Sequence, residues 1–425
     1  MQTALLDSFR STTHGQEAEA ILRACVHCGF CTATCPTYQL LGDELDGPRG
    51  RIYLIKQVLE GSQPSRHTQR HLDRCLTCRA CETTCPSGVR YGRLLDIGRS
   101  LVEKRVRRPM HDRILRRILR AFIPHARRFA AGLRLAQAFA FIFPSALRRS
   151  LPKRQARAIW PQSTHARTML ALNSCVQQAS APNIDAAAAR VLDRLGVTLT
   201  RVPAGGCCGA LSYHLAAHEE GLAFARRNID AWWPHIEAGA EAIVITASGC
   251  GSMIKEYGHL LREDATYAQR AARVSAITLD ISEVLSREDR TRLGASGITG
   301  KRIAFHSPCS LQHGQKLTGV VESLLTDAGF DLVPVPDAHL CCGSAGTYSI
   351  LESKISQRLL RNKIAALESG HPLIIATANI GCLLHLQSGT NIAVRHWIEL
   401  FDPQAEVVGG MRDATIVDRT AQSNL

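Results

Sequence analysis

Two stretches of the chain carry the same pattern of four cysteines followed by a proline. The first has cysteines at positions 25, 28, 31 and 35, and the second at 75, 78, 81 and 85. Both match C-x2-C-x2-C-x3-C-P, a spacing that binds a [4Fe–4S] cubane through thiolates. Three cysteines so spaced can wrap a loop around one cubane and coordinate three of its irons. Because the pattern occurs twice, we predict two [4Fe–4S] clusters.

The fourth cysteine of each run points away from its own loop, because the proline after it turns the chain. In two-cluster ferredoxins this cysteine ligates the other cluster. We therefore predict crossed ligation. The first cluster is assigned to Cys25, Cys28, Cys31 and Cys85, and the second to Cys75, Cys78, Cys81 and Cys35.

Zinc and disulfides are the alternative uses of such cysteines. Zinc sites usually take paired C-x2–4-C units rather than triplets followed by Cys-Pro. Disulfides need an oxidising compartment. The first ten residues have neither a basic region nor a long apolar stretch, so they do not resemble a signal peptide. Sixteen cysteines in such a chain predict a reducing cytoplasm and thiols that serve metals or redox chemistry.

Helical patterns position the two cysteine runs. Pro48 suits a first helical turn, apolar residues follow at helical spacing to Leu59, and Gly61 can cap the end. A second helical pattern covers 94–102, after the second run. Helices rather than hairpins between the runs predict an α-helical ferredoxin-type domain over residues 1–103.

From residue 166 onward the chain repeats itself. Four cysteine positions of one half recur in the other at offsets of 134, 134, 134 and 132 residues, which indicates an internal duplication. The first half contains Cys175, Cys207, Cys208 and Cys250, and the second contains Cys309, Cys341, Cys342 and Cys382. We place the two halves at residues 166–297 and 298–425.

Short apolar runs precede these cysteines, and helical stretches separate them: 184–195 and 215–236, then 311–328 and 351–367. Strands alternating with helices predict parallel βαβ units, and therefore a multidomain α+β chain whose second part is a duplicated α/β domain. Loops after parallel strands meet at one edge of a sheet. Each half can thus gather four thiols. They are enough for a third cluster, or they are structural thiols.

Several histidines accompany the cysteines. Those flanking the second half could donate N–H···S bonds to a cluster, although loop or packing roles are the favoured interpretation. They are His306, His313, His339 and His385. His27 lies inside a cluster loop, where it is better placed to donate a bond to sulfur than to act as a ligand.

The segment between the two parts, residues 104–165, is strongly basic. Residues 101–160 contain sixteen lysines and arginines and two acids, a net charge of +14, which equals that of the whole chain. Apolar residues recur at Ile114, Leu115, Ile118, Leu119 and Phe122, with arginines at Arg113, Arg116, Arg117 and Arg120. This pattern predicts a basic amphipathic helix that binds an anionic lipid surface; the alternative is a linker helix packed on a neighbour. Nucleic acid is disfavoured, because aromatic residues are not interleaved.

Two ferredoxin-type runs followed by two CCG repeats resemble the iron–sulfur subunits of flavin-linked dehydrogenases. This group includes subunits of glycolate oxidase, anaerobic glycerol-3-phosphate dehydrogenase, lactate utilisation proteins and heterodisulfide reductase. The stretch 23–40, with 42–51 and the sequence Asn379-Ile-Gly-Cys382, is most similar to the glycolate oxidase branch. In heterodisulfide reductases each half ends in C-x-x-C and five cysteines hold an unusual cluster. Here Ala247 and Asn379 replace the first cysteine of that pair.

The resemblance implies partner flavoproteins that bind FAD and oxidise glycolate to glyoxylate. This chain would then relay electrons to a quinone or another membrane acceptor. The basic segment predicts a peripheral position on the cytoplasmic face of the inner membrane. No G-x-G-x-x-G fingerprint occurs in the chain, and cubanes pass electrons singly, so the isolated chain is not expected to be catalytic. Alternatives are a subunit of a lactate or glycerol-3-phosphate dehydrogenase, or a CCG-type thiol–disulfide reductase.

Overall fold

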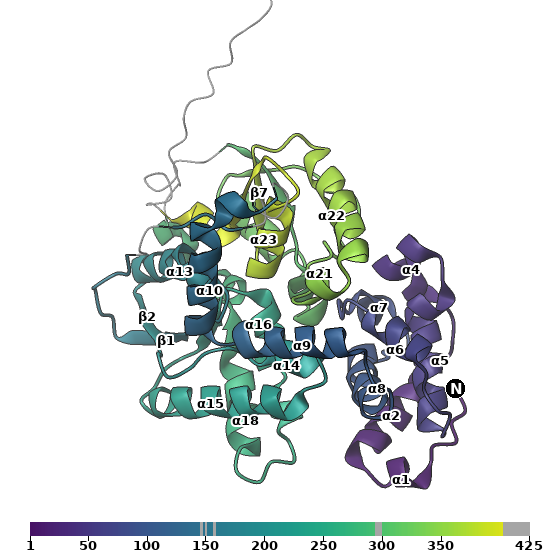
Figure 1. Cartoon of the computed structure of the whole chain (residues 1–425). Helices are drawn as coiled ribbons and strands as arrows, with labels where there is room; N and C mark the ends of the chain where they lie inside the picture. The colour runs from purple at the N-terminus through teal and green to yellow at the C-terminus, as the bar shows by residue number, and fades with distance from the viewer. Residues whose placement is uncertain (145–147, 149–150, 156–158, 294–299, 403–425) are drawn as a thin grey trace, which may run out of the picture.

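The computed structural model describes residues 1–144, 148, 151–155, 159–293 and 300–402. Figure 1 shows the N-terminal helices gathered on one side, beside two mixed α/β halves. The N-terminal module comprises α1 (Asp7–Arg10), α2 (Thr13–Ala24), α3 (Phe30–Ala33), α4 (Pro36–Leu41), η1 (Glu44–Asp46), α5 (Pro48–Leu59), α6 (Arg66–Asp73), α7 (Ala80–Thr84) and α8 (Tyr91–Arg105). The prediction of a helical ferredoxin-type module is confirmed.

The core of this module is formed by α2, α5 and α8. Leu22, Ile55 and Leu94 lie at its centre and are fully buried. Gly98 lets α8 approach α5 closely, because a Cβ at this position would lie 2.6 Å from a side-chain carbon of Ile55. The three helices form a scaffold on which both cysteine loops are mounted.

Within the described residues, each α/β half contains one four-stranded parallel sheet. The first sheet has the order β2-β1-β3-β4 and the second β6-β5-β7-β8, so the duplicated sequence folds into duplicated topology. The strands are β1 (Arg167–Ala171), β2 (Val197–Arg201), β3 (Ile243–Ile245), β4 (Thr278–Asp280), β5 (Arg302–His306), β6 (Asp331–Leu332), β7 (Ile374–Thr377) and β8 (Ala393–His396). The prediction of tandem parallel α/β units is confirmed.

The helices that cover these sheets largely follow the predicted stretches. In the first half they are α12 (Gln177–Ser180), α13 (Asn183–Arg194), α14 (Ala210–His214), α15 (His218–Glu237), α16 (Ser248–Ile254), α17 (Tyr257–Leu260), α18 (Ala268–Ile277), α19 (Ile281–Arg287) and η3 (Arg290–Leu293). In the second they are η4 (Ser310–Gly314), α20 (Val320–Asp327), α21 (Tyr348–Leu351), α22 (Ser353–Glu368), α23 (Ile380–Gln387) and η5 (Trp397–Phe401).

One predicted helix is wrong in extent. The stretch 311–328 is not continuous, because a single π-type turn, η4, ends at Gly314 and α20 begins only at Val320. Gly319 at the start of α20 has a φ of +79°, outside the helical region, which separates the two elements. Cys309 directly precedes the short η4 and caps its start.

The basic segment forms two helices, α9 (Met110–Phe122) and α10 (Ala126–Ala138), followed by η2 (Ala140–Ile142). Figure 1 shows α9 running from α8 across the face of the first half. The residues 145–147, 149–150 and 156–158 of the predicted segment lie outside the described residues. No described helix has the length and apolar character needed to cross a membrane.

The N-terminal module contacts both halves through its second cysteine run. Leu76 packs in an apolar cluster with Tyr348 and Leu359 of the second half. Arg79 forms an ion pair of 3.0 Å with Glu256 of the first half. The module is thereby held with the Cys75–Cys85 run against the junction of the two halves.

Candidate iron–sulfur centres and a thiol-lined cavity

Both cysteine runs of the N-terminal module adopt the same backbone conformation. His27 and Thr77, at equivalent positions, have φ of 57° and 56°. Gly29 and Arg79, also equivalent, have φ of 86° and 60°. Left-handed residues in such loops turn successive N–H groups toward one point, forming a concavity that binds anions, including iron–sulfur clusters. The same left-handed backbone positions in both runs are consistent with each loop wrapping one cubane.

The first group of sulfurs combines three cysteines of the first run with one of the second. The neighbours whose charge raises the pKa of Cys31 are Cys25, Cys85 and Cys28. These four cysteines also line one small cavity, together with Cys81 of the second run. Cys28 is exposed, and so are its neighbours Val26 and Phe30, at 66% and 60%. This group therefore lies at the molecular surface.

The second group combines the other run with Cys35. The charges of Cys78, Cys75 and Cys35 raise the pKa of the Cys81 thiol. Cys35 and Cys75 are buried, at 6% and 8% exposure. Both groupings have the composition that crossed ligation requires, and the ligand assignment itself stays a prediction.

Burial opposes ionisation of these thiols. It raises the pKa of Cys31 to about 11, and the pKa of Cys78 and Cys81 well above the ordinary value. Because iron binds the thiolate, cluster insertion must displace these protons, and the bound metal supplies the free energy for it. The donor set, eight cysteine sulfurs converging in two groups of four, fits two [4Fe–4S] clusters.

A buried arginine beside the second group was missed by sequence reasoning. Arg51 is 1% exposed and donates to the carbonyl oxygen of His71 and to Thr37 Oγ1. The charges that act on its guanidinium include the thiolates of Cys75 and Cys35. A permanent cation at this place balances the negative charge of a thiolate-bound cluster. The only sequence signal was its place in the polar stretch 42–51.

Tyr91 provides a second contact to this group. Its hydroxyl lies 3.6 Å from Cys75 Sγ, and the residue is 4% exposed. Hydrogen bonds to cluster sulfurs are among the factors that set reduction potential. Arg51 and Tyr91 thus surround the second group from two sides.

The four thiols of the first α/β half form a contiguous chain. Cys175 is hydrogen-bonded to Cys207, which neighbours Cys208, and Cys208 is hydrogen-bonded to Cys250. The hydrogen bonds from Cys175 and Cys208 lower the pKa of Cys207, aided by the Gly209 N–H at 3.4 Å. Cys207 is therefore a thiol whose ionisation the neighbouring thiols favour.

Gly209 allows this arrangement. Its φ is +87°, and a Cβ there would lie 2.4 Å from the Gly221 carbonyl oxygen. The equivalent Gly343 has a φ of +91° and places its N–H 3.4 Å from Cys341 Sγ. The glycine after each Cys-Cys pair is thus needed for close backbone approach.

The second half gathers its thiols in the same way, directly against the N-terminal module. Cys309 Sγ and Cys341 Sγ are 3.9 Å apart. Among neighbouring charges, that of Cys309 raises the pKa of Cys78 in the second cysteine run the most. Cys342 is hydrogen-bonded to Cys382 deeper in the half.

A cavity of ≈ 960 Å³ lies between the N-terminal module and the two halves. Thiols of both halves and of the second cysteine run face it, namely Cys75, Cys78, Cys175, Cys207, Cys208, Cys250, Cys309, Cys341 and Cys382. The structure therefore brings together cysteines from three separate parts of the sequence, namely the second cysteine run and the two α/β halves.

The histidines of the second half are mostly bonded in its loops. His313 contacts Thr83 Oγ1 of the N-terminal module at 3.0 Å and the carbonyl oxygen of His339 at 3.0 Å. His385 contacts Ser356 Oγ at 3.2 Å. His306 is 2% exposed, and burial lowers its pKa to about 3, so its ring is neutral.

Comparison with known proteins agrees with this architecture. Residues 21–89 match the 4Fe-4S dicluster domain, and residues 169–255 and 303–387 both match the cysteine-rich domain. The chain is 56% identical to the glycolate oxidase iron–sulfur subunit of Escherichia coli (strain K12), over 96% of this chain and 100% of that protein. The chain belongs to the glycolate oxidase iron–sulfur subunit family.

Two further relatives share less of the sequence. The chain is 31% identical to a probable glycolate oxidase iron–sulfur subunit of Bacillus subtilis (strain 168), over 87% of this chain and 89% of that protein. A lactate utilization protein A of Anoxybacillus flavithermus is also 31% identical, over 52% of this chain and 92% of its own length. Family membership makes this chain an iron–sulfur subunit with two [4Fe–4S] clusters.

The crossed assignment predicts which substitutions act on the same cluster. Cys78→Ser and Cys35→Ser should both remove about four of about eight iron atoms and the same electron paramagnetic resonance signal. Cys85→Ser should instead remove the other signal. Iron analysis and spectroscopy of anaerobically purified variants measure both. If Cys35→Ser damages the cluster of Cys25, crossed ligation is wrong. A wild-type content near twelve iron atoms would establish a third cluster.

Tyr91→Phe should lower the reduction potential of the second cluster. The hydroxyl bond to Cys75 stabilises the more negative, reduced cluster, and losing about 1 kcal/mol corresponds to roughly 40 mV for one electron. A redox titration followed by paramagnetic resonance measures the shift. Tyr53→Phe, on the exposed side of α5, is the control and should leave both potentials unchanged. A larger shift of the first cluster would contradict this assignment.

Proposed function

We propose that this chain is the electron-relay subunit of a glycolate-oxidising complex. In this proposal an FAD-containing partner oxidises glycolate to glyoxylate, and the chain carries the electrons singly toward a quinone or another membrane acceptor. Removal of a hydride needs a two-electron cofactor such as a flavin, whereas cubanes accept one electron each. The chain therefore serves an oxidoreductase without binding the substrate itself.

The relay is supported mainly by where the two cysteine groups lie. The first group opens to solvent at Cys28, between the exposed side chains of Val26 and Phe30. The second is mostly buried, and its Cys78 packs against the same apolar cluster as Cys309 of the second half. One centre at the surface and one in the interior is the arrangement expected of a path between a partner protein and an internal cavity.

The chain alone should not oxidise glycolate, whereas the chain together with its flavoprotein partner should. Glycolate added to the complex should bleach the partner's flavin and then reduce the clusters of this chain. Anaerobic absorption spectroscopy of the co-purified complex measures both steps. Reduction by lactate or glycerol 3-phosphate but not glycolate would contradict the substrate. Catalytic thiol–disulfide exchange by the isolated chain, lost in Cys341→Ser, would instead indicate a thiol–disulfide reductase.

We further propose that α9 docks the complex on an anionic membrane surface. Met110, Ile114, Ile118 and Phe122 recur every fourth residue, so they form one stripe, and they are 63%, 51%, 49% and 52% exposed. Leu119, which the sequence pattern grouped with them, is instead buried at 8% and anchors the helix to the protein. The exposed stripe has the composition of an interfacial helix.

The arginines of α9 divide into two sets. Arg116 pairs with Asp73 of α6 at 3.5 Å, and Arg120 pairs with Glu220 of α15 at 3.2 Å, so these two hold the helix in place. Arg113 and Arg117 are exposed and have no carboxylate partner among the described residues. Each free arginine near an anionic surface contributes about 1 kcal/mol. Burial of the stripe adds a few kcal/mol, at about 25 cal/mol per Å².

Reversing the two free charges should weaken membrane binding. The double variant Arg113→Glu/Arg117→Glu should bind anionic vesicles at least tenfold more weakly, because both attractions become repulsions. Vesicle sedimentation at low and high salt measures this, and wild-type binding should fall steeply with salt. Lys354→Glu/Arg361→Glu on α22 makes the same change in net charge elsewhere and should have little effect. Equal loss in both variants would mean that α9 is not the docking element.

A further inference from the structure

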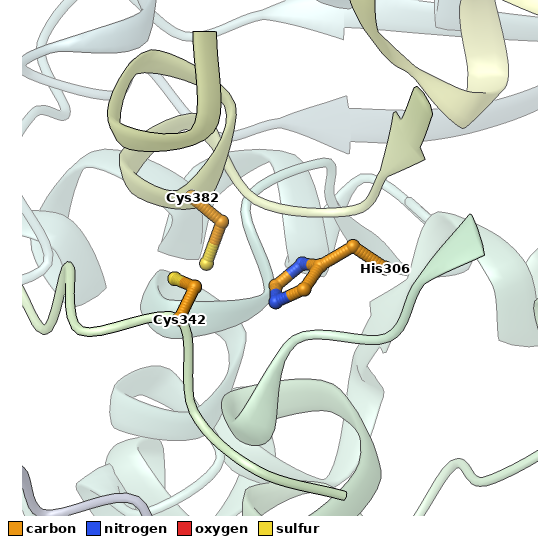
Figure 2. Close-up of side chains that lie close together, drawn as sticks. All are labelled: His306, Cys342 and Cys382. Carbon is orange, nitrogen blue, oxygen red and sulfur yellow. The ribbon is translucent and has the colours of Figure 1, made fainter. Parts of the chain in front are cut away.

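Three potential metal ligands meet in the interior of the second half. His306, Cys342 and Cys382 place their ligand atoms within 4.8 Å of one another. Figure 2 shows the two sulfurs facing each other, with the imidazole ring beside them. The three residues come from the end of β5, the Cys-Cys loop and α23, and are 2%, 1% and 4% exposed. This group includes a histidine, unlike the predicted iron–sulfur ligands.

The imidazole of His306 has one bonded and one unbonded nitrogen. Nδ1 lies 2.9 Å from Thr377 Oγ1, which fixes the orientation of the ring. Nε2 is buried and has no hydrogen-bond partner among the described residues. A buried polar atom without a partner costs about 1–3 kcal/mol. Ligating histidines commonly bond through the other ring nitrogen to an outer partner, as His306 does to Thr377.

The spacing of the three donors fits a single ion better than a cubane. Zinc binds sulfur at about 2.3 Å and nitrogen at about 2.0 Å, which in a tetrahedron puts the donors about 3.5–3.8 Å apart. The three ligand atoms lie within 4.8 Å of one another, so small shifts of the side chains would bring them to these distances. The ligands of a cubane bind different irons and must be farther apart.

The first half offers a natural comparison. When Cys175 is matched with Cys309, Leu172 stands at the position of His306. The first half thus has the same four thiols without the nitrogen donor. Among the described residues only one other group of donors is as compact, that of Asp43, Asp46 and His71.

That other group is already neutralised by the protein. Asp46 pairs with Arg74 at 2.6 Å and with Arg51 at 3.5 Å, so no further cation is needed there. At the second-half group, by contrast, Asn379 Nδ2 lies 3.5 Å from Cys382 Sγ, a neutral donor that suits a ligating thiolate.

We propose that His306 Nε2, Cys342 Sγ and Cys382 Sγ bind one divalent zinc ion, in the second half only. Binding releases two thiol protons, and two thiolates with a neutral imidazole leave the ion-bound site without net charge. Cys382 also borders the large cavity, which gives the ion an access route. The ion would link β5, the Cys-Cys loop and α23. This proposal does not depend on the proposed electron relay.

Metal analysis of the full chain tests this site. The anaerobically purified protein should bind one zinc per chain in addition to its iron, and Co²⁺ in its place should show thiolate charge-transfer absorption. His306→Leu, which installs the residue of the first half, should weaken zinc binding at least tenfold while iron content stays unchanged. His385→Leu is the matched control and should bind zinc as the wild type does.

Thr377→Val is a second variant, in case His306→Leu does not fold. It keeps the shape of the threonine side chain but removes the hydroxyl that contacts His306 Nδ1. It should weaken zinc binding about tenfold by freeing the ring. Unchanged zinc affinity in His306→Leu, or in Thr377→Val if the first variant is insoluble, would overturn the proposal. So would loss of iron rather than zinc in either variant, because His306 would then support a cluster. Failure of the wild type to bind stoichiometric zinc or cobalt would also overturn it.

Discussion

The structure depends on the balance of negative charge around buried thiolates. Iron binds cysteine as the thiolate, and burial of Cys78 and Cys81 raises the pKa of both thiols. The fold places hydrogen-bond donors and a cation beside these thiols, where they can stabilise the negative charge. Left-handed backbone at His27 and Thr77 turns N–H groups inward, and the buried Arg51 supplies a full positive charge. Helices α2, α5 and α8 serve largely to hold these groups in register.

Much of this arrangement could be predicted from the sequence. Cysteine spacing predicted two cubane sites in the N-terminal module, because a cubane leaves few ways to space its ligands, and the division of the eight sulfurs between the two sites stays a prediction. The recurrence of four cysteines predicted the duplicated sheets. Strands β2, β4, β6 and β8 were not predicted, because they are partly polar, as in Asp331–Leu332. Their places were set by pairing with the apolar strands β1, β3, β5 and β7.

Contacts between distant segments escaped sequence reasoning. Nothing in the local sequence of Arg51 showed that it would be buried beside Cys35 and Cys75. His306 was interpreted as a packing residue, since its nearness to Cys342 and Cys382 arises only when three loops meet. The useful signal was a difference within the duplication, Leu172 in one half and His306 in the other. On α9, periodicity grouped Leu119 with an apolar face that the fold divides into buried and exposed parts.

The unequal exposure of the two cysteine groups has a consequence for oxidative damage. An oxidant diffusing from solvent meets Cys28 first, whereas the sulfurs of Cys35 and Cys75 are shielded by the protein. The outer centre is thus the one at risk whenever this subunit stands alone. A partner that covers Val26 and Phe30 would shield it from oxygen as well as exchange electrons with it. Assembly of the complex would then also protect the outer cluster. A subunit without its partner would lose the cluster at Cys28 before the buried one.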